Sequence, residues 1–351
     1  MKKLDRHIGM TVLTAMLVVM IVISFLDTLF GFMAQLDAIR ANYQLPEVMR
    51  YMLLTTPKRI YEVIPVAALI GCLSGLGSLA NHSELVVMRA AGVSLVRIGW
   101  SVMKPAIVLM LIGLILSEYI SPVTDQMAET GRKIARSADG HYSDEGLWHR
   151  EGNEYLYFNA VEPNGVLYGI NIFRFDDHKL QESIYAERAL SQGDHWILEG
   201  VEASQFHDDK VESRVAATET WQTSLTTTLL KVVVMKPENL SISGLYTYIN
   251  YLQKQGLDSG EYKLAMYKKA LQPAAIFALV LIGMSFVFGP LRAVSMGLRL
   301  FSGVITGVTF MIIQNLMGPA SLVFGFSPFV AVLVPILVCF AVGAVLLKRA
   351  G

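Results

Sequence analysis

The longest stretch without a charged side chain comprises residues 300–347, which are 48 in number. As one α-helix it would measure about 72 Å, more than twice the roughly 30 Å hydrocarbon core of a bilayer. The stretch therefore has to fold back on itself, and the helix breakers Gly318-Pro319 and Gly325-Phe326-Ser327-Pro328 mark where it can do so. The sequence thus predicts two membrane-spanning helices in this stretch alone.

Four more apolar runs, at 8–26, 63–81, 98–117 and 270–291, are each long enough to cross a bilayer. Only 17% of the residues are charged, whereas soluble domains contain about 25%. We therefore expect an α-helical membrane protein with six transmembrane helices, three before and three after a long polar insert.

The polar insert at 122–269 carries 37 of the 58 charged side chains and has a net charge of −7, whereas the rest of the chain has a net charge of +7. Within it, apolar and polar residues alternate in short runs that are separated by turn residues. This spacing is typical of a sandwich or a jelly roll. The expected domains are helices at 1–121, an all-β, jelly-roll-like insert with flanking helices at 122–269, and helices at 270–351.

Lysine and arginine residues in the short loops predict the orientation in the membrane. Nine of them fall on the side of the two termini and four on the opposite side. We therefore expect both termini in the cytoplasm and the insert outside.

Asp27 is the one carboxylate deep within a predicted span. An acid inside the membrane is a candidate functional group, because burying it in lipid is costly. The outer interface lies only about two helical turns away, so an interfacial position explains Asp27 equally well.

The segment between the second and third spans has the signals of a short helix. Ser83 suits the N-cap, Glu84 suits the positive first turn, and Gly92 suits the position where a helix ends. A helix of about two turns is unstable alone in water, and this one is apolar around most of its surface. We expect it to bind a groove on another protein; a plain interfacial linker is the alternative.

The sequence contains none of the common nucleotide-binding or hydrolase motifs. It has no Gly-Lys dipeptide, and hence no P-loop, and neither H-E-x-x-H nor G-x-S-x-G. Its histidines lack metal-ligand spacing, and a formal net charge of zero excludes a wholly basic nucleic-acid binder. We predict no catalytic residue, no metal site, no cofactor bound by this chain and no nucleic-acid partner.

Several strings resemble the lipopolysaccharide export permeases, the LptF/LptG family. They are Leu4-Asp5-Arg6-His7-Ile8-Gly9, the short helix at 83–92, Leu240-Ser241-Ile242-Ser243-Gly244-Leu245 and the stretch at 288–297. The resemblance extends over the whole chain, including its three-plus-three spans. It implies a permease subunit of an ABC transporter in the bacterial inner membrane, with a β-jellyroll in the periplasm, that extracts lipopolysaccharide and passes it toward the outer membrane.

The resemblance also implies the partners. A permease of this family pairs with a paralogue, here an LptF-like chain, on a dimer of an LptB-like ATPase that holds ATP and Mg²⁺. The lipid then passes to LptC-like and LptA-like bridge proteins. The first and fifth spans form lateral gates with the paralogue, and they correspond to 9–33 and 298–317 here.

In the family the short helix is a coupling helix that contacts the ATPase, and the glutamate that faces an ATPase arginine matches Glu84. The coupling residues implied here are Ser83, Glu84, Leu85, Val86, Met88, Arg89 and Gly92. These residues would receive the motion that ATP hydrolysis drives in the other subunit.

Lipid phosphates would be bound by basic residues near the outer face. Arg132 matches a basic residue of the family after the third span, and Lys133 and Arg136 lie nearby. Members of the family can carry lysines near the outer end of the first span, where Arg40 is the nearest base in this chain.

The residues alone leave other readings open. A membrane-bound enzyme acting on lipid would need a convergent acid–base or metal cluster, and the sequence gives no sign of one. A membrane-anchored assembly or sensor protein with a periplasmic β domain would have no transport role. Without the resemblance, Arg132 and its neighbours would be interpreted as a solvated charged helix.

Overall fold

The structure, a computed structural model, describes residues 2–37, 39, 43–137, 147–161, 166–176, 179–193, 195–207, 210–223, 236–254, 257–289 and 294–350. The chain divides into two compact units. The first comprises Met1–Phe30, Thr56–Ile120 and Ser241–Gly351, and the second comprises Gly31–Thr55 and Ser121–Leu240. The helices that follow the sheet thus belong to the first unit, whereas the expected insert at 122–269 included their beginning.

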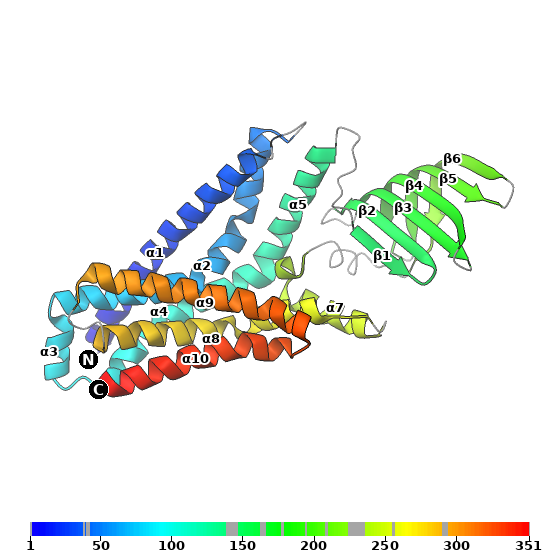
Figure 1. Ribbon diagram of the computed structural model, residues 1–351. Helices are drawn as coiled ribbons and strands as arrows, with labels where there is room; N and C mark the ends of the chain where they lie inside the picture. Colours follow the sequence, from blue (N-terminus) through cyan, green and yellow to red (C-terminus); the bar gives the residue numbers. More distant parts are fainter. Residues whose placement is uncertain are drawn as a thin grey trace. The chain divides into compact units, whose positions relative to one another are not determined.

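The helices are α1 (Lys2–Leu36), α2 (Leu45–Asn81), α3 (Glu84–Ala90), α4 (Leu95–Ile115), α5 (Ser121–Ser137), α7 (Ile242–Lys254), α8 (Gly260–Phe288), α9 (Met296–Phe324) and α10 (Pro328–Ala350). A π-helical turn, η1 (Leu116–Ile120), joins α4 to α5. Among the described residues, six helical segments are long and apolar enough to cross a membrane, as predicted. In Figure 1 the start of α1 and the end of α10 lie at the same end of the first unit as α3.

The long apolar stretch folds back at one of its two predicted break points. Helix α9 ends at Phe324, Gly325 has a left-handed φ of 73°, and α10 begins at Pro328. The expectation of a break at Gly318-Pro319 is wrong, because both residues lie inside α9. Gly318 packs against Leu264 of α8, where an added Cβ would lie 3.1 Å from the leucine Cδ2. Packing of this kind lets a membrane helix continue through a proline.

Helix α2 is the most buried span of the first unit, with 72% of its apolar window inside the protein. Helix α1 approaches it closely through two glycines of α2. A Cβ added to Gly71 would lie 2.4 Å from Cα of Met16, and one added to Gly75 would lie 2.8 Å from Cα of Val12. Small residues of this kind are what allow helix backbones to meet in a membrane.

Helix α9 packs on α2 through its own glycines. A Cβ at Gly303 would lie 2.3 Å from Cδ1 of Leu73, and one at Gly307 would lie 3.2 Å from Cγ1 of Val66. The glycine pairs 71/75 of α2 and 303/307 of α9, each with a spacing of four residues, therefore both lie at helix contacts that involve α2.

The second unit contains one six-stranded antiparallel sheet with the strands in chain order. The strands are β1 (Leu147–Glu151), β2 (Glu154–Val161), β3 (Leu167–Asp176), β4 (Lys179–Ser191), β5 (Trp196–Phe206) and β6 (Val211–Trp221). A short 3₁₀ turn, η2 (Pro237–Asn239), follows. The predicted all-β insert between the third and fourth spans is confirmed, and its described strands form an up-and-down meander.

One face of this sheet is apolar and buried. Leu156, Ile172, Ile184 and Ala203 are register neighbours across four strands, and all four are buried. Alternation along each strand places these residues on the same face. The period-two pattern read from the sequence therefore identified the face that packs.

The alternation changes phase at two glycines with left-handed backbones, Gly169 (φ 61°) and Gly200 (φ 64°). Leu198 and Val201 are both buried although they are an odd number of residues apart. An added Cβ at Gly200 would lie 2.8 Å from Cγ of Glu187 on the neighbouring strand. Glycine is required here for both the positive φ and the close approach.

We predict that Gly71→Ala destabilises the protein by about 1–3 kcal/mol, because the new methyl group meets the backbone of α1 and cannot be accommodated by a side-chain shift. The measurement is thermal unfolding in detergent. The control is Gly297→Ala on α9, where an added Cβ has no neighbour within 4 Å, and where we expect a change within about 0.5 kcal/mol. Equal unfolding temperatures for the two variants would contradict close packing at Gly71.

Candidate functional site

The short helix α3 lies between α2 and α4, where the sequence predicts it, and Gly92 ends it. Gly92 has a left-handed φ of 85°. Its N–H donates to the Arg89 carbonyl at 3.0 Å, and the N–H of Val93 donates to the Met88 carbonyl at 3.1 Å. These bonds satisfy carbonyls of the last turn. The prediction that this helix ends at Gly92 is confirmed.

Ser83 does not cap this helix as predicted. Its φ of 59° and ψ of 5° are left-handed, and its side chain accepts no capping hydrogen bond. An N-cap residue needs an extended backbone, but Ser83 belongs to the tight turn that leaves α2, in which its N–H donates to the Ala80 carbonyl at 3.0 Å. The expectation of a capping bond from Ser83 is therefore wrong.

Helix α3 has two distinct faces. Leu85 and Met88 are buried in the apolar core of the first unit. Val86 and Val87 are 55% and 65% exposed, and Arg89 is also exposed. Only the second face is available to a partner, so the groove contact expected for Leu85 and Met88 is made within the chain itself. Val87, which the sequence analysis did not single out, belongs to the exposed face.

Two polar contacts connect this end of the first unit to α1. Nε2 of His7 lies 2.8 Å from Oε2 of Glu84, the first residue of α3. Arg97, near the start of α4, donates from Nε and Nη2 to both carboxylate oxygens of Asp5, at 3.0 and 2.9 Å. The amino-terminal end of α1 is thus bonded to both α3 and α4.

Helix α9 has a contact at the same end. Arg299 is buried, and its Nη1 donates to Oδ1 of Asn81 at 3.3 Å. Asn81 is the last residue of α2, and two residues separate it from α3. Of the two helices that correspond to the expected lateral gates, α1 therefore contacts α3, and α9 contacts the end of α2 that leads into α3.

These two helices also expose the most apolar surface. Only 17% of the apolar window of α1 and 22% of that of α9 is buried. Exposed side chains on α1 include Ile21, Phe25 and Phe30, and those on α9 include Phe301, Ile305 and Leu316. Large apolar faces on membrane helices are covered by lipid or by another membrane protein.

Asp27, the candidate intramembrane acid, is bonded to a neighbouring helix. Nη1 of Arg59 on α2 donates to Oδ2 of Asp27 at 2.7 Å and to its backbone carbonyl at 3.2 Å. The pair neutralises the carboxylate and connects α1 to α2. Acids within spans are commonly paired in this way.

Arg132 of α5 is held by two residues that the sequence analysis did not single out. Its Nη2 donates to Oε2 of Glu129 at 3.0 Å, and its guanidinium lies 5.2 Å from the ring centroid of Tyr51. The Tyr51 hydroxyl donates to the other oxygen of Glu129 at 3.0 Å. Tyr51 is 78 residues before Glu129, so no local sequence signal reveals this group of three.

The other predicted phosphate-binding residues are not all seen. Lys133 lies next to Arg132 on α5 and is half-buried. Arg136 lies on the same helix, but its side chain is outside the described residues, and Arg40 lies outside them altogether. The structure therefore brings Arg132 and Lys133 together on one helix.

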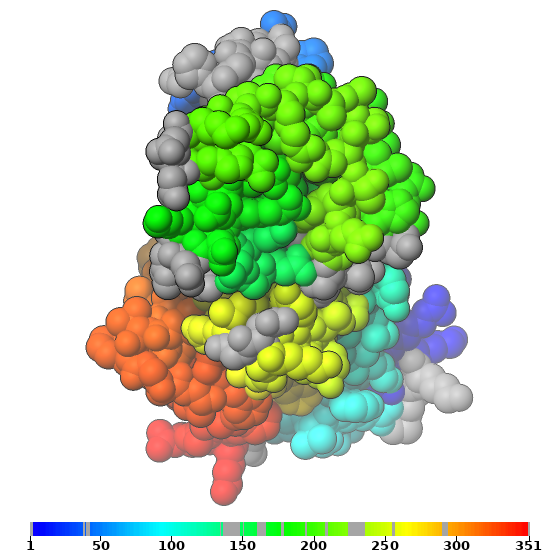
Figure 2. All heavy atoms as spheres, turned by 90° about the vertical axis from the view of Figure 1, so that its right-hand side faces the viewer, coloured from blue at the N-terminus to red at the C-terminus, as the bar shows by residue number. Residues whose placement is uncertain are grey.

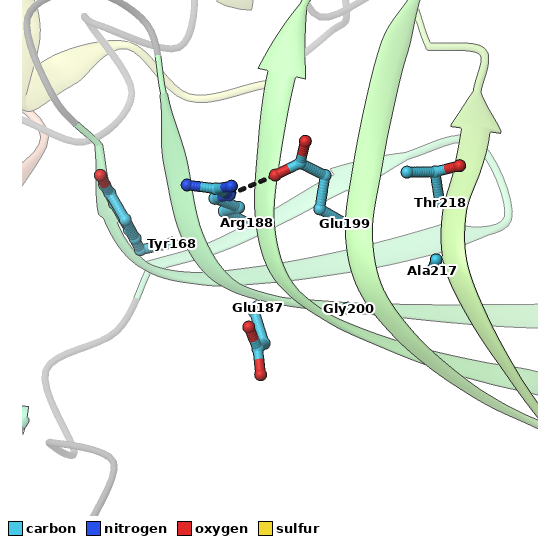
Figure 3. A pocket seen from close by; sticks show the side chains of 7 residues that line it. All are labelled: Tyr168, Glu187, Arg188, Glu199, Gly200, Ala217 and Thr218. Atoms are coloured by element: carbon cyan, nitrogen blue, oxygen red, sulfur yellow. Dashed lines mark hydrogen bonds and ion pairs between the residues drawn. The ribbon is translucent and has the colours of Figure 1, made fainter.

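A groove of about 510 Å³ lies on the sheet beside Gly200. Its lining includes Tyr168, Arg188 and Glu199, and Arg188 forms an ion pair with Glu199 (Figure 3). In Figure 3 Glu187 points away from this pair. Because Arg188 is neutralised by Glu199, the groove offers no net positive charge to a phosphate group.

No group of His, Cys, Asp or Glu side chains suited to a metal ion occurs among the described residues. Burial lowers the pKa of His149, a residue of β1, and so disfavours its cationic form.

The comparisons with known proteins cover almost the whole chain. The family model described as "Lipopolysaccharide export system permease LptF/LptG" matches residues 6–349. The lipopolysaccharide export system permease protein LptG of Escherichia coli (strain K12) is 37% identical over 352 residues, which cover 99% of this chain and 98% of that protein. The protein of the same name from Haemophilus influenzae is 34% identical over 337 residues, covering 95% of this chain and 94% of the relative. The chain belongs to the LptF/LptG family of lipopolysaccharide export permeases.

Proposed function

We propose that this chain is a permease subunit of an ABC transporter that extracts lipopolysaccharide from the bacterial inner membrane and passes it through its β domain toward the outer membrane. Family membership over residues 6–349 is the observation that carries the proposal. It supports transport over an assembly or sensor role, and over an enzyme acting on lipid.

The apolar faces of α1 and α9 fit a lateral gate. Each helix has one side packed on α2 and most of its apolar span outside the protein. An LptF-like paralogue that covers these faces would complete the transmembrane cavity. A lipid with several acyl chains could then leave the bilayer sideways between helices that are not packed permanently against each other.

The driving force has to come from another subunit, because the sequence has no P-loop. An LptB-like ATPase dimer would hold ATP and Mg²⁺. Its contact surface on this chain would be the exposed face of α3, namely Val86, Val87 and Arg89, together with the half-exposed Glu84. Leu85 and Met88 would transmit the resulting movement into the core in which they are buried.

Movement of α3 would reach both gate helices by direct contacts. His7 connects Glu84 to α1, and the Asp5–Arg97 pair connects α1 to α4. The bond from Arg299 to Asn81 connects α9 to the end of α2. A rigid displacement of α3 would therefore act on the inner ends of α1 and α9 together.

Arg132 would bind a lipid phosphate near the outer ends of the spans, with Lys133 beside it. A guanidinium has five N–H donors and suits phosphate geometry. Contact with the Tyr51 ring and with Glu129 orients it before the lipid arrives. The lipid would then pass along the β domain to LptC-like and LptA-like proteins.

We predict that Glu84→Ala abolishes lipid transport while the membrane part still folds. Removing one partner of a buried charge pair costs about 3–5 kcal/mol, because the facing ATPase arginine loses its counter-charge. The measurement is ATP-dependent release of lipopolysaccharide from proteoliposomes that contain both permeases and the ATPase, with ATP hydrolysis followed in parallel.

The matched control is His7→Ala, which removes the partner of Glu84 within the chain and leaves the carboxylate. We expect this variant to lose some transport but clearly less than Glu84→Ala, because an exposed His–Glu pair contributes little and the Asp5–Arg97 pair still connects α1 to α4. Glu84→Arg should be worse than Glu84→Ala, and an acid at the facing ATPase arginine should partly restore it. Normal transport by Glu84→Ala would contradict the coupling role of Glu84. A wild-type complex that releases no lipid would contradict the proposed function.

We also predict that Arg132→Gln weakens lipopolysaccharide binding about tenfold or more, because a charge-assisted hydrogen bond is worth roughly 1.5–3 kcal/mol. Glu129→Gln should bind at least as tightly as the wild type, since it removes the competing carboxylate. Crosslinking or fluorescence titration of the lipid measures both. Arg188→Gln, at an exposed arginine of the sheet, is the control, and an equal loss there would argue against a specific role of Arg132.

The orientation can be tested with single cysteines. We propose that both termini lie in the cytoplasm and the sheet in the periplasm, so a cysteine replacing Lys210 should react with an impermeant thiol reagent in cells whose inner membrane is intact. A cysteine replacing the exposed Val87 of α3 should react only after that membrane is opened. The reverse pattern would overturn this orientation.

A further inference from the structure

The chain leaves the first unit for the sheet-bearing unit after Phe30 and again after Ile120, and it returns at Thr56 and at Ser241. The second pair of crossing points, which flanks the sheet, is joined by one side chain, that of Glu118 in the π-helical turn η1. Glu118 bonds to residues 124 and 125 positions later, at the start of α7. All of these residues belong to the first unit.

The Glu118 carboxylate accepts three hydrogen bonds. Oε2 accepts from the backbone N–H of Ile242 at 2.8 Å. Oε1 accepts from the N–H of Ser243 at 3.2 Å and from its hydroxyl at 2.6 Å. A carboxylate at the positive end of a helix dipole, with several N–H and O–H donors, is bound strongly.

These contacts complete the N-terminus of α7. The N–H of Gly244 donates to the Ser241 hydroxyl oxygen at 3.0 Å, so Ser241 is the N-cap. The Glu118 carboxylate accepts from the N–H groups of Ile242 and Ser243, the first two residues of the helix. The first N–H groups of a helix have no partner within it. Glu118, which lies in the segment that precedes the sheet, therefore supplies acceptors for the first N–H groups of the helix that follows the sheet.

Helix α7 is itself held in place by packing of its apolar side chains. Leu245, Tyr248, Ile249 and Leu252 are buried. Tyr248 also meets Tyr262 of α8, with ring centroids 4.6 Å apart. Figure 2 shows α7 and the start of α8, in yellow, at the surface of the first unit. The carboxylate of Glu118 thus attaches η1 to a helix that is itself packed in place.

The segment that carries Glu118 is continuous with the candidate ATPase contact. Only four residues separate α3 from α4, and η1 follows α4 directly. The Ser94 hydroxyl caps α4 by accepting from the N–H of Arg97 at 3.3 Å. A π-helical turn is less stable than an α-helix and often marks a functional position. Here it turns Glu118 toward α7.

We propose that Glu118 is a positioning residue for lipid transfer. Its carboxylate holds the outgoing turn η1 and the returning helix α7 together as one double connection to the sheet-bearing unit. Movement of α4 then reaches both connections at once, instead of bending the outgoing one alone. The inference rests on the proposed transport function.

The test compares Glu118→Ala with the wild type in the complete transporter in nanodiscs. Nitroxide labels at Val108 of α4 and Lys254 of α7, in a chain with Cys72 and Cys339 replaced by alanine, report the contact by electron–electron resonance. The fraction of molecules with η1 and α7 separated should rise roughly 10- to 100-fold, which is what charge-assisted bonds contribute to an equilibrium constant. The distance distribution should broaden accordingly.

Lipid delivered per ATP hydrolysed is the second readout. It should fall strongly in Glu118→Ala, with ATP hydrolysis and the amount of assembled complex unchanged. Glu118→Gln, which keeps one acceptor oxygen, should restore part of it, and Ser243→Ala, which removes only the hydroxyl donor, should have a small effect. The control is Glu261→Ala, at an exposed acid in the first turn of α8.

The outcomes separate the two claims. If the wild-type complex delivers no lipid, the proposed function fails whatever Glu118 does. If it delivers lipid and Glu118→Ala keeps both the wild-type ratio and the wild-type distance distribution, the role of Glu118 fails. If Glu118→Ala does not assemble, the test rests on Glu118→Gln and Ser243→Ala. Wild-type lipid delivery per ATP and a wild-type distance distribution in both variants would contradict the proposal.

Discussion

Close backbone approach to α2 is the constraint on which the first unit depends. Four neighbouring helices meet α2 at a glycine: α1 at Gly71, α4 at Gly113, α8 at Gly283 and α9 at Gly303. Association of helices in lipid lacks the hydrophobic driving force that acts in water, so it relies on close packing and polar contacts. With α2 enclosed in this way, α1 and α9 each keep one face packed and the other exposed. The availability of these two helices to a second membrane protein follows from this arrangement.

Polar contacts add the second constraint, and they are concentrated on α1. Asp5 and His7, near its amino terminus, bind α4 and α3, and Asp27 binds Arg59 of α2 further along. The glycine contacts with α2 lie between these points. Helix α1 therefore cannot slide freely along α2. If α1 is a gate helix, its carboxy-terminal part moves only when the Asp27–Arg59 pair stretches, whereas its amino-terminal end follows α3 and α4.

The sequence was sufficient for features that depend on composition and period. Apolar runs gave the six spans, alternation gave the apolar face of the sheet, and Gly92 marked the end of α3. Conformations set by neighbouring elements were not predictable in this way. The side chain of Ser83 does not cap α3, because Ser83 belongs to the turn that leaves α2. Pro319 lies inside α9, which packs on α8 at the neighbouring Gly318. The groups around Arg132 and Glu118 combine residues far apart in the chain, so only the folded structure brings them together.

The ion pair between Arg132 and Glu129 affects how readily a bound lipid phosphate can be released. Arg132 is already paired with Glu129 and rests on the Tyr51 ring. A lipid phosphate that binds Arg132 would therefore replace one anion with another, instead of neutralising an isolated cation. The phosphate has to displace the bond between Arg132 and Glu129, so binding gains less than it would at an unpaired arginine. Release is correspondingly easier, because Glu129 returns as the phosphate leaves. Moderate affinity of this kind suits a site that has to pass its lipid on.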